Sequence, residues 1–545
     1  MARKIEKVKI GNKEVMLLTI PSGIVTTEVS CLERIAQDIP EIGVLTTKSI
    51  GLSPRAGNRE PILAQYIPGG FVNAVGLTNP GAEEFARRLA SARIPEDKFL
   101  LVSIFGKDEE EFVQVARTLD DRADGFELNL SCPHAKGYGM QLGQDPEIVY
   151  KITKAVSQAT KKPMFAKLTP NAGNIGEIAK AAVSAGARGI TAINTVGPGY
   201  HLADGHPVLT NQAGVGGLSG IGITPIGLRC VKDIRQAVGQ EILVIGMGGI
   251  RTARDVEDYT SAGADVFGIG SALAGMTEEE MKHYFHTLAN DLENGTNDAE
   301  RLLKRVHMDY TKVKVEEIEN LACDFKVIRT SGAIDASPGQ FVFAWIPGVG
   351  EKPFSVMDNF PLTLGVLERG ALTRKINSLK RGDSFYVRGP YGKEAKVPMG
   401  ADIVLVGGGC GIAGLYFLAK MLSRKEGTVQ ALLAAKDRAH IPYLEKFGRY
   451  GSVEIATEDG SMGRRGIVTD LLHEMAPRLR EGSYFFNCGP RAMVEAVLPL
   501  ELRVSSSERV YSSVDYMTRC GVGICGSCAD GKGRRTCVEG PFVNP

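Results

Sequence analysis

The chain has 545 residues, of which 43% are hydrophobic and 23% charged, and its formal net charge is +1. This length predicts about three or four domains, and the near-neutral charge gives no sign of a nucleic-acid or membrane-surface partner. No apolar run approaches the ~20 residues that a membrane-spanning helix needs, and the first residues do not form an apolar signal sequence. The ten cysteines suit a reducing compartment, so we expect a cytoplasmic protein.

Residues 1–300 alternate short apolar runs with helical stretches. The predicted strands are Val15–Ile20, Gly43–Thr47, Phe99–Ile104, Gly125–Leu130, Met164–Ala166, Gly189–Ile193, Ile242–Gly246 and Asp265–Ile269. Eight such units over about 280 residues predict an α/β fold of the (β/α)8 (TIM) barrel type. Alternating units also build open doubly wound sheets.

The residues at the end of each run favour the barrel, because each of these stretches contains polar residues or glycine. They are Ser22-Gly23, Lys48, Ser103, Asn129 to Cys132, Lys167, Asn194-Thr195, Gly248-Gly249 and Gly270-Ser271. Carboxyl ends of barrel strands carry the active site, and the last strands commonly bind phosphate. Asparagine amides suit a planar ring with amide and imide groups. Cys132 stands in a Gly- and Pro-rich loop, which favours an accessible thiol for proton transfer over a buried small hydrophobe.

Seven segments carry a family resemblance: LTTKS, NAVGLTNPG, LNLSCPH, FAKLTPN, AINT, GGLSG and GMGGI, in this order. They resemble the catalytic subunit of class 1 dihydroorotate dehydrogenases. The resemblance implies FMN contacts at Ser22, Gly23, Lys167, Thr195, Gly217, Gly249, Gly270 and Ser271. It implies substrate contacts at Lys48, Asn73, Gly76, Leu77, Asn129, Asn194 and Thr195.

The resemblance also implies a mechanism. Cys132 would take a proton from C5 of dihydroorotate while hydride passes from C6 to FMN, and Lys48 would bridge flavin and substrate. The barrel would form a dimer.

One residue departs from this family, which usually has Asn where this chain has His134. Ser-Cys-Pro-His also occurs in the pyrimidine domain of dihydropyrimidine dehydrogenase. His134 would either donate to the ligand or shape the loop. An alternative function is therefore uracil reduction with NAD(P)H.

Residues 306–398 contain short, closely spaced strands that predict a small antiparallel β-barrel: Thr311–Glu317, Cys323–Thr330, Gln340–Trp345, Pro361–Leu367 and Ser384–Gly389. Three motifs in this stretch (KPFSV, GALT and RGPYG) resemble the FAD-binding barrel of ferredoxin–NAD(P) reductases, and more closely the electron-transfer subunit of class 1B dihydroorotate dehydrogenases. The implied FAD residues are Lys352, Pro353, Phe354, Ser355, Gly370 and Thr373. Lys352 replaces the usual arginine, which keeps the charge but loses the planar fork.

Residues 400–503 predict an α/β nucleotide-binding domain. A strand from Ile403 leads into a glycine turn and a helix, whose N-terminus suits an anion. The expected NAD residues are Gly407, Gly408, Gly409, Gly411, Cys488, Gly489 and Pro490, the last three following the run Tyr484–Phe486. Lys436 and Arg438 either attract a 2′-phosphate or are solvated surface, so NADH and NADPH both stay open.

Residues 505–545 carry four cysteines in the pattern Cys-x4-Cys-x2-Cys followed by a fourth: Cys520, Cys525, Cys528 and Cys537. This spacing is typical of a 2Fe-2S cluster. Zinc usually takes two Cys-x2-Cys pairs, and disulfides suit secreted chains.

Taken together, these resemblances imply that dihydroorotate is oxidised to orotate in pyrimidine biosynthesis. Electrons would pass through FMN, the 2Fe-2S cluster and FAD to NAD+, in one chain that fuses the catalytic and electron-transfer subunits. A second alternative is a flavoprotein that carries electrons from NAD(P)H to a ferredoxin. The amide-rich strand ends argue against it.

Overall fold

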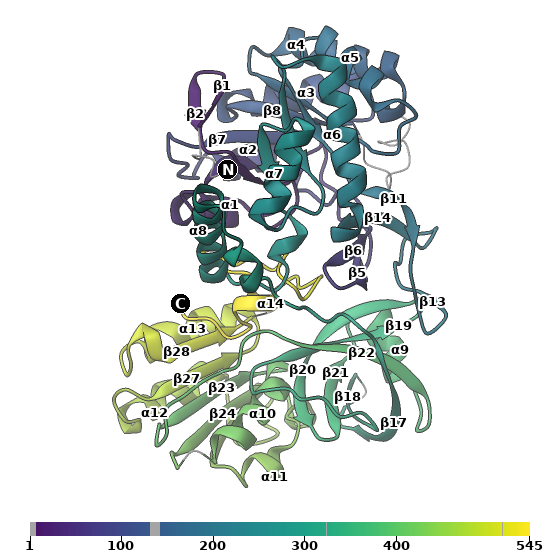
Figure 1. Cartoon of the computed structure of the whole chain (residues 1–545). Coiled ribbons are helices and arrows are strands. Elements are labelled where there is room, and N and C mark those ends of the chain that lie inside the picture. The colour runs from purple at the N-terminus through teal and green to yellow at the C-terminus, as the bar shows by residue number, and fades with distance from the viewer. Residues whose placement is uncertain (1–6, 131–141, 323, 425, 515) are drawn as a thin grey trace. The chain divides into compact units, whose positions relative to one another are not determined.

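The computed structural model describes residues 7–130, 142–322, 324–424, 426–514 and 516–545. The chain forms two compact units (Figure 1). One comprises Met1–His307 with Val522–Arg534, and the other comprises Met308–Gly521 with Arg535–Pro545. Within the described ranges, no helix has the length and apolar character needed to cross a membrane.

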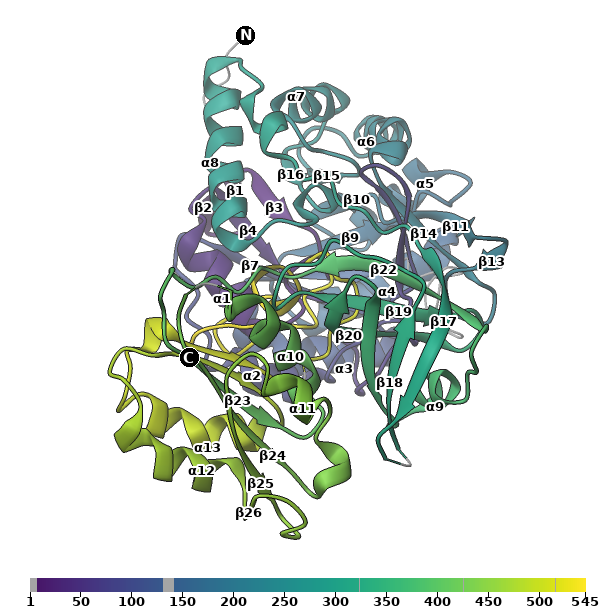
Figure 2. The ribbon, with the colours of Figure 1, turned by 90° about the horizontal axis from the view of Figure 1, so that it is seen from below.

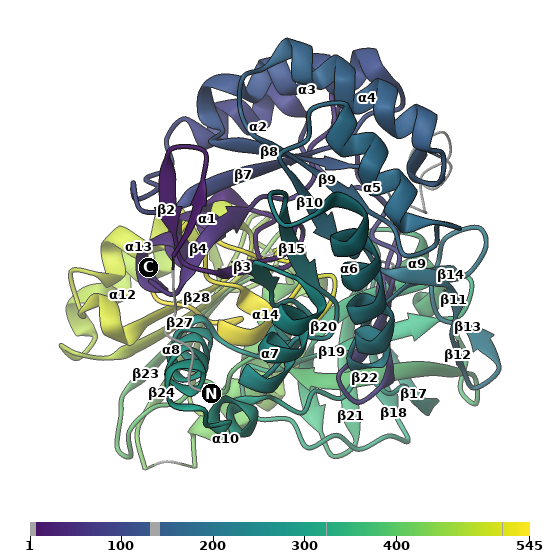
Figure 3. The ribbon, with the colours of Figure 1, turned by 45° about the horizontal axis from the view of Figure 1, so that its top comes forward.

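The first unit contains the predicted barrel, closed by eight parallel strands (Figure 3). They are β3 (Leu18–Ile20), β4 (Ile42–Thr46), β7 (Phe99–Ile104), β8 (Gly125–Asn129), β9 (Met164–Leu168), β10 (Gly189–Ala192), β15 (Leu243–Met247) and β16 (Val266–Gly268). They pair in chain order, and the pairing of Phe267 with Leu18 closes the ring. The barrel is confirmed and the open sheet is excluded for this part of the chain.

The first strand differs from its prediction, which ran from Val15 to Ile20. The structure divides this run, because Val15 belongs to a separate hairpin of β1 (Val8–Ile10) and β2 (Lys13–Val15). Only β3 enters the barrel. An apolar run does not reveal where the chain turns from one strand into the next.

Eight helices follow the barrel strands: α1 (Val29–Asp38), α2 (Ala82–Leu89), α3 (Glu109–Leu119), α4 (Pro146–Ala159), α5 (Ile175–Ser184), α6 (Thr224–Val238), α7 (Ala253–Ala262) and α8 (Glu278–Asn294). Each buries an apolar face against the strands in one continuous core. Local sequence sets several of the starts. Thr252 with Asp255 forms a capping box at α7, and Thr277 with Glu280 forms another at α8.

A four-stranded sheet is inserted between the barrel elements, in the order β11 (Val196–Tyr200), β14 (Val215–Gly220), β6 (Gly70–Asn73), β5 (Leu63–Ile67). A short pair, β12 (Leu202–Ala203) and β13 (His206–Pro207), extends from it along the chain. In this sheet Asn73 pairs with Gly217. The register therefore brings together two residues that are far apart in the sequence.

The second unit begins with a closed antiparallel barrel of six strands, in the order β17-β18-β21-β20-β19-β22 (Figure 2). They are β17 (Thr311–Asn320), β18 (Phe325–Thr330), β19 (Phe341–Ile346), β20 (Gly350–Asn359), β21 (Leu362–Leu367) and β22 (Ser384–Tyr391), with α9 (Ala371–Asn377) before the last strand. The small barrel is confirmed. Sequence reasoning missed β20, because Lys352 and Pro353 interrupt its apolar pattern.

The rest of the second unit is a parallel sheet in the order β26-β25-β24-β23-β27-β28. Its strands are β23 (Ile403–Gly408), β24 (Val429–Ala435), β25 (Ser452–Thr457), β26 (Arg464–Arg465), β27 (Tyr484–Cys488) and β28 (Val510–Ser513). Its helices are α10 (Gly411–Leu422), α11 (Leu444–Phe447), α12 (Val468–Met475) and α13 (Arg491–Glu501), and α14 (Thr536–Glu539) follows near the C-terminus. The α/β domain is thus present. The predicted borders between four domains stay a prediction.

Candidate active site

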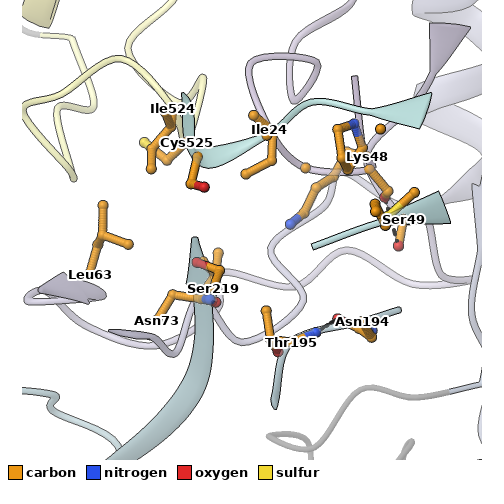
Figure 4. A pocket seen from close by; sticks show the side chains of 18 of the residues that line it. Ile24, Lys48, Ser49, Leu63, Asn73, Asn194, Thr195, Ser219, Ile524 and Cys525 are labelled. Carbon is orange, nitrogen blue, oxygen red and sulfur yellow. Dashed lines mark hydrogen bonds between the residues drawn. The ribbon is translucent and has the colours of Figure 1, made fainter. Parts of the chain in front are cut away.

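A cavity opens at the carboxyl ends of the strands of the first barrel (Figure 4). Its walls include thirteen of the predicted substrate and FMN residues: Ser22, Gly23, Lys48, Asn73, Gly76, Leu77, Asn129, Lys167, Asn194, Thr195, Gly249, Gly270 and Ser271. Gly217 is not in the wall, but its carbonyl accepts a hydrogen bond from Asn73 Nδ2 at 3.1 Å. The predicted Cys132 and His134 lie outside the described residues.

Ser49 is the centre of a hydrogen-bond network in this cavity. Its hydroxyl lies 3.1 Å from that of Ser22 and 2.9 Å from that of Ser103, and it accepts from Asn129 Nδ2 at 2.9 Å. These residues come from the ends of four different strands. Ser49 follows the predicted Lys48 but was itself not predicted, because a lone serine carries no distinctive signal.

The network continues to Asn194 and Thr195. Asn194 Nδ2 donates to Asn129 Oδ1 at 3.4 Å, and Asn194 Oδ1 accepts from the backbone N–H of Thr195 at 2.8 Å (Figure 4). Each amide is thereby given a fixed orientation. A fixed amide presents its donor and acceptor to a ligand without a further loss of side-chain freedom.

A buried ion pair lies beneath the network. Lys167 Nζ lies 3.3 Å from Glu127 Oε1, which also accepts from Ser103 Oγ at 2.9 Å. Lys167 is 5% exposed and Glu127 is 1% exposed. Sequence reasoning missed Glu127. The sequence did contain a signal for it, namely a carboxylate inside an otherwise apolar strand. A buried charge requires a partner, so such a residue indicates a nearby cation or hydrogen-bond donor.

The second cation of the cavity, Lys48, packs against a bare backbone. A Cβ atom at Gly23 would lie 2.8 Å from Lys48 Nζ, and Gly23 has a φ of +77°. A larger residue at this position would displace the ammonium group. Glycine at this position therefore allows the positive φ of the turn and leaves space for the Lys48 side chain.

The turn at Gly76 and Leu77 is held in an unusual conformation, with φ values of +83° and +57°. Leucine rarely adopts a positive φ. Asn79 stabilises the turn: its Nδ2 donates to the Leu77 carbonyl at 2.9 Å, and its Oδ1 accepts from the N–H of Gly81 at 2.9 Å. Asn79 is a supporting residue that the sequence alone did not reveal.

The segment Val522–Arg534 supplies another wall of the cavity, through Ile524, Cys525 and Ser527 (Figure 4). The Ile524 carbonyl accepts from the N–H of Val25 at 2.7 Å, and the Cys525 carbonyl accepts from Thr27 Oγ1 at 2.7 Å. This contact joins residues about 500 positions apart, so no local pattern could predict it.

The residues of this cavity fit a flavin mononucleotide. The side chains offer amides, hydroxyls and two ammonium groups to a polar ring, and glycine backbones line another part of the wall. At Gly249 (φ +84°) a Cβ atom would lie 2.1 Å from Thr224 Oγ1, so only glycine fits. Exposed glycine backbone is a common way to admit a phosphate group.

A second cavity lies within the second unit and gathers all the predicted FAD residues: Lys352, Pro353, Phe354, Ser355, Gly370 and Thr373. Gly411, Cys488, Gly489 and Pro490 line it as well. The Thr373 hydroxyl accepts from the N–H groups of Arg369 and Gly370, both at 2.9 Å. It thus also caps the start of α9.

A third cavity in the second unit is lined by Gly408, Gly409 and Pro490 of the predicted NAD residues. Lys436 belongs to this wall, and its Nζ lies 3.7 Å from Asp324 Oδ2. Gly407 lies instead inside β23, where a Cβ atom would meet Leu415 at 2.9 Å. Gly407 therefore packs the sheet against its helix.

The predicted cluster cysteines fall into both units. Cys525 and Cys528 belong to the first, and Cys520 and Cys537 to the second. All four are free of disulfides, as thiolate ligands must be, and three are buried. Among the residues with described positions, no three His, Cys, Asp or Glu side chains form a group that could hold a metal. The ligand set stays a prediction from spacing and donor chemistry.

Comparison with known proteins gives the family. The model of the family "Dihydroorotate dehydrogenase" matches residues 8–291. The "Dihydroorotate dehydrogenase B (NAD(+)), catalytic subunit" of Methanocaldococcus jannaschii is 44% identical over 258 residues, which cover 47% of this chain and 82% of that protein. The protein of the same name from Pyrococcus abyssi is 45% identical over 257 residues, covering 47% and 83%.

Solved structures align less closely. A chain of an NADH-dependent reduced ferredoxin-NADP oxidoreductase is 26% identical, with coverage of 43% of this chain and 87% of its own and a TM-score of 0.39, which is too low to support an inference. The family match spans more than half of the 545 residues. The chain belongs to the dihydroorotate dehydrogenase family.

Proposed function

We propose that this chain oxidises dihydroorotate to orotate with NAD+ as the final electron acceptor, in pyrimidine biosynthesis. Family membership and the names of the relatives support this function. The observation that carries it is the meeting of Asn73, Asn129 and Asn194 with Lys48 and Lys167 in one cavity.

The cavity matches the chemistry of the substrate. Dihydroorotate is an anion with a ring of amide and imide groups, and oriented amides pair with such an edge in both directions. Lys48 supplies positive charge beside the ring. In this proposal Asn129 and Asn194, which both line the cavity, hold the ring through their side-chain amides.

Oxidation needs a base and a hydride acceptor. Cys132 is proposed to remove the C5 proton, and its thiolate form is the one that acts, so the rate rises with pH through its ionisation. FMN bound in the first cavity would supply the hydride acceptor, and FAD bound in the second cavity, together with a 2Fe-2S cluster, would supply electron carriers toward NAD+. The wall position of Cys525, a predicted cluster ligand, supports an electron exit at segment Val522–Arg534. A dimer of the barrel stays a prediction.

An anaerobic spectral titration tests this function. Dihydroorotate should bleach the flavin and iron–sulfur absorbance of the full chain, and NAD+ should then restore it with formation of NADH. Cys132→Ala should abolish bleaching by dihydroorotate but leave reduction by NADH intact.

Two other outcomes would overturn the proposal. If dihydroorotate left the spectrum unchanged while NADPH bleached it and uracil restored it, the chain would be a pyrimidine reductase. If neither pyrimidine acted and a ferredoxin accepted electrons from NADH, the chain would be an electron-transfer flavoprotein.

A further inference from the structure

The small barrel of the second unit buries a complete ion pair between Glu351 of β20 and Arg388 of β22. Arg388 Nε donates to Glu351 Oε1 at 2.6 Å, and Nη2 donates to Oε2 at 2.7 Å. Arg388 is 2% exposed and Glu351 is 1% exposed. This two-point geometry is the strongest form of a carboxylate–guanidinium contact.

Aromatic rings enclose the pair. The Arg388 guanidinium carbon lies 4.0 Å from the centre of the Phe343 ring, and Tyr310 donates its hydroxyl proton to Glu351 Oε1 at 2.7 Å. Desolvating two charges costs much of what their attraction returns. Apolar residues of similar size would therefore serve the barrel about as well, and stability alone does not account for this pair.

The remaining donors of Arg388 point to another role. Its Nη1 group donates to the hydroxyl of Tyr391 at 2.9 Å and to the backbone carbonyl of Cys520 at 3.0 Å. Cys520 is the first of the four cysteines with cluster spacing. A guanidinium has five donors in a rigid plane, so it can hold a carboxylate and a main-chain carbonyl in a fixed relation.

The next residue shows how closely the chain lies on this wall. Gly521 has a φ of +84°, and a Cβ atom there would lie 2.9 Å from the Phe343 ring and 3.2 Å from that of Tyr391. The backbone at Cys520 and Gly521 therefore rests on the same rings that enclose the guanidinium. Both residues are fixed to the barrel by contacts that the ion pair organises.

We propose that Arg388 is a positioning residue for Cys520, and that the buried pair with Glu351 exists to hold this cysteine for the 2Fe-2S cluster. The proposal rests on the proposed function, because that function includes the cluster. Residues that orient a metal ligand typically change metal affinity by about 10- to 100-fold when they are removed. Hydrogen bonds and charge near the cluster also influence its potential.

The test compares iron release and cluster spectra in variants of the full chain. Arg388→Met/Glu351→Gln removes the donor and both charges together. We expect iron release to a chelator at least about tenfold faster than in the wild type, an altered electron paramagnetic resonance spectrum of the reduced cluster, and a midpoint potential shifted to more negative values. Trp345 is the one tryptophan of the chain and is fully buried in the same barrel, so its emission reports whether the barrel is folded.

Two further variants separate positioning from folding. Tyr310→Phe removes a hydrogen bond to the same Glu351 without touching Cys520, and should leave iron release and spectrum as in the wild type. Arg388→Lys keeps a charge opposite Glu351 but loses the fork, and should release iron faster with native Trp345 emission.

Wild-type iron release and spectra in both Arg388 variants would overturn the role of Arg388 while leaving the cluster in place. An equal effect of Tyr310→Phe would overturn it as well, because the effect would then follow the barrel rather than Cys520. A wild-type chain that binds no iron under reconstitution would overturn the cluster and this role together. Dihydroorotate bleaching of the flavin in that chain would still report on the substrate part of the proposed function.

Discussion

Each of the two barrels of this chain contains a buried ion pair, and the two pairs have different surroundings. In the parallel barrel, Lys167 meets Glu127 through one contact at 3.3 Å, and the carboxylate is tied by Ser103 to the cavity network. In the antiparallel barrel, Arg388 meets Glu351 through two contacts of 2.6 and 2.7 Å among aromatic rings. The first pair lies at the wall of an open cavity, whereas the second is enclosed.

The surroundings of a buried charge determine how much it depends on its partner. Each charge of an enclosed pair depends wholly on the other, since neither solvent nor a ligand can take the place of the missing charge. A pair at a cavity wall can exchange part of its interaction with a ligand or water. We therefore expect single substitutions to affect folding most in the second barrel and ligand binding most in the first.

The largest effect is expected for Arg388→Met. It leaves the Glu351 carboxylate buried without its cation, and breaking a buried pair in this way costs about 3–5 kcal/mol. Unfolding by denaturant, followed by Trp345 emission, measures this loss. Arg388→Met/Glu351→Gln should recover most of the stability. A single variant as stable as the double variant would contradict the enclosed character of the pair.

A smaller loss of stability, about 1–3 kcal/mol, is expected for Lys167→Met. Ser103 continues to donate to Glu127, and the cavity that Lys167 lines can admit water at the position that its ammonium group leaves. The greater loss should be in flavin binding, measured as FMN retained after gel filtration. If Lys167→Met destabilised the chain as much as Arg388→Met and kept its FMN, the comparison of the two barrels would be wrong.

The sequence predicted the strand ends of the first barrel because chemistry and fold coincide there. Asn129, Lys167 and Asn194 follow apolar runs, and barrel topology brings such ends together. The supports of these residues were not predictable in the same way. Glu127 accepts a hydrogen bond from Ser103, which lies 24 residues away in the sequence. Asn79 accepts from Gly51, 28 residues away, and donates to Leu77 in the strained turn.

The second unit shows the same limit. The FAD motifs were identified as sequence, but β20, which carries Lys352 to Ser355, was not predicted as a strand. Its strand pairing is set by the neighbours β19 and β21, which a linear pattern does not contain. The contact of Arg388 with Cys520 depends on tertiary packing in the same way.

Glu501 is a buried carboxyl group without a cation as its partner, unlike Glu127 and Glu351, because its hydrogen-bond partner is an amide. Asn487 Nδ2 donates to Glu501 Oε2 at 2.7 Å, and burial raises the pKa of Glu501 to about 7. The protonated form is favoured in the fold, so its stabilising effect is complete below the unfolded pKa of about 4.5 and is lost as the pH rises through about 7.

We expect the free energy of unfolding of the second unit to fall by about 2–3 kcal/mol between pH 4.5 and pH 8 through this group. Glu501→Gln should flatten this dependence. Denaturant unfolding of wild type and variant across that pH range measures it. A variant with the same pH dependence as the wild type would assign the titration to other groups.

The smallest effect is expected in segment Val522–Arg534, which forms part of the cavity wall in the first unit. A Cβ atom at Gly526, which has a φ of +68°, would lie 2.4 Å from the Val25 carbonyl oxygen, whereas one at Gly531 would meet nothing within 4 Å. Gly526→Ala should therefore destabilise the docked segment by about 1–2 kcal/mol, because both the backbone conformation and the contact resist a side chain.

Gly531→Ala is the matched control in the same segment and should be close to neutral. Proteolysis of the full chain at residues 522–534 and FMN retention measure the effect, since Ile524 and Cys525 line the cavity proposed for FMN. Faster cleavage with weaker FMN retention in Gly526→Ala alone would show that docking of segment Val522–Arg534 is needed for FMN to stay bound. Equal cleavage and equal FMN retention in the two alanine variants would mean that the segment contacts the barrel without stabilising the cavity wall. The proposed electron exit would then have to lie elsewhere.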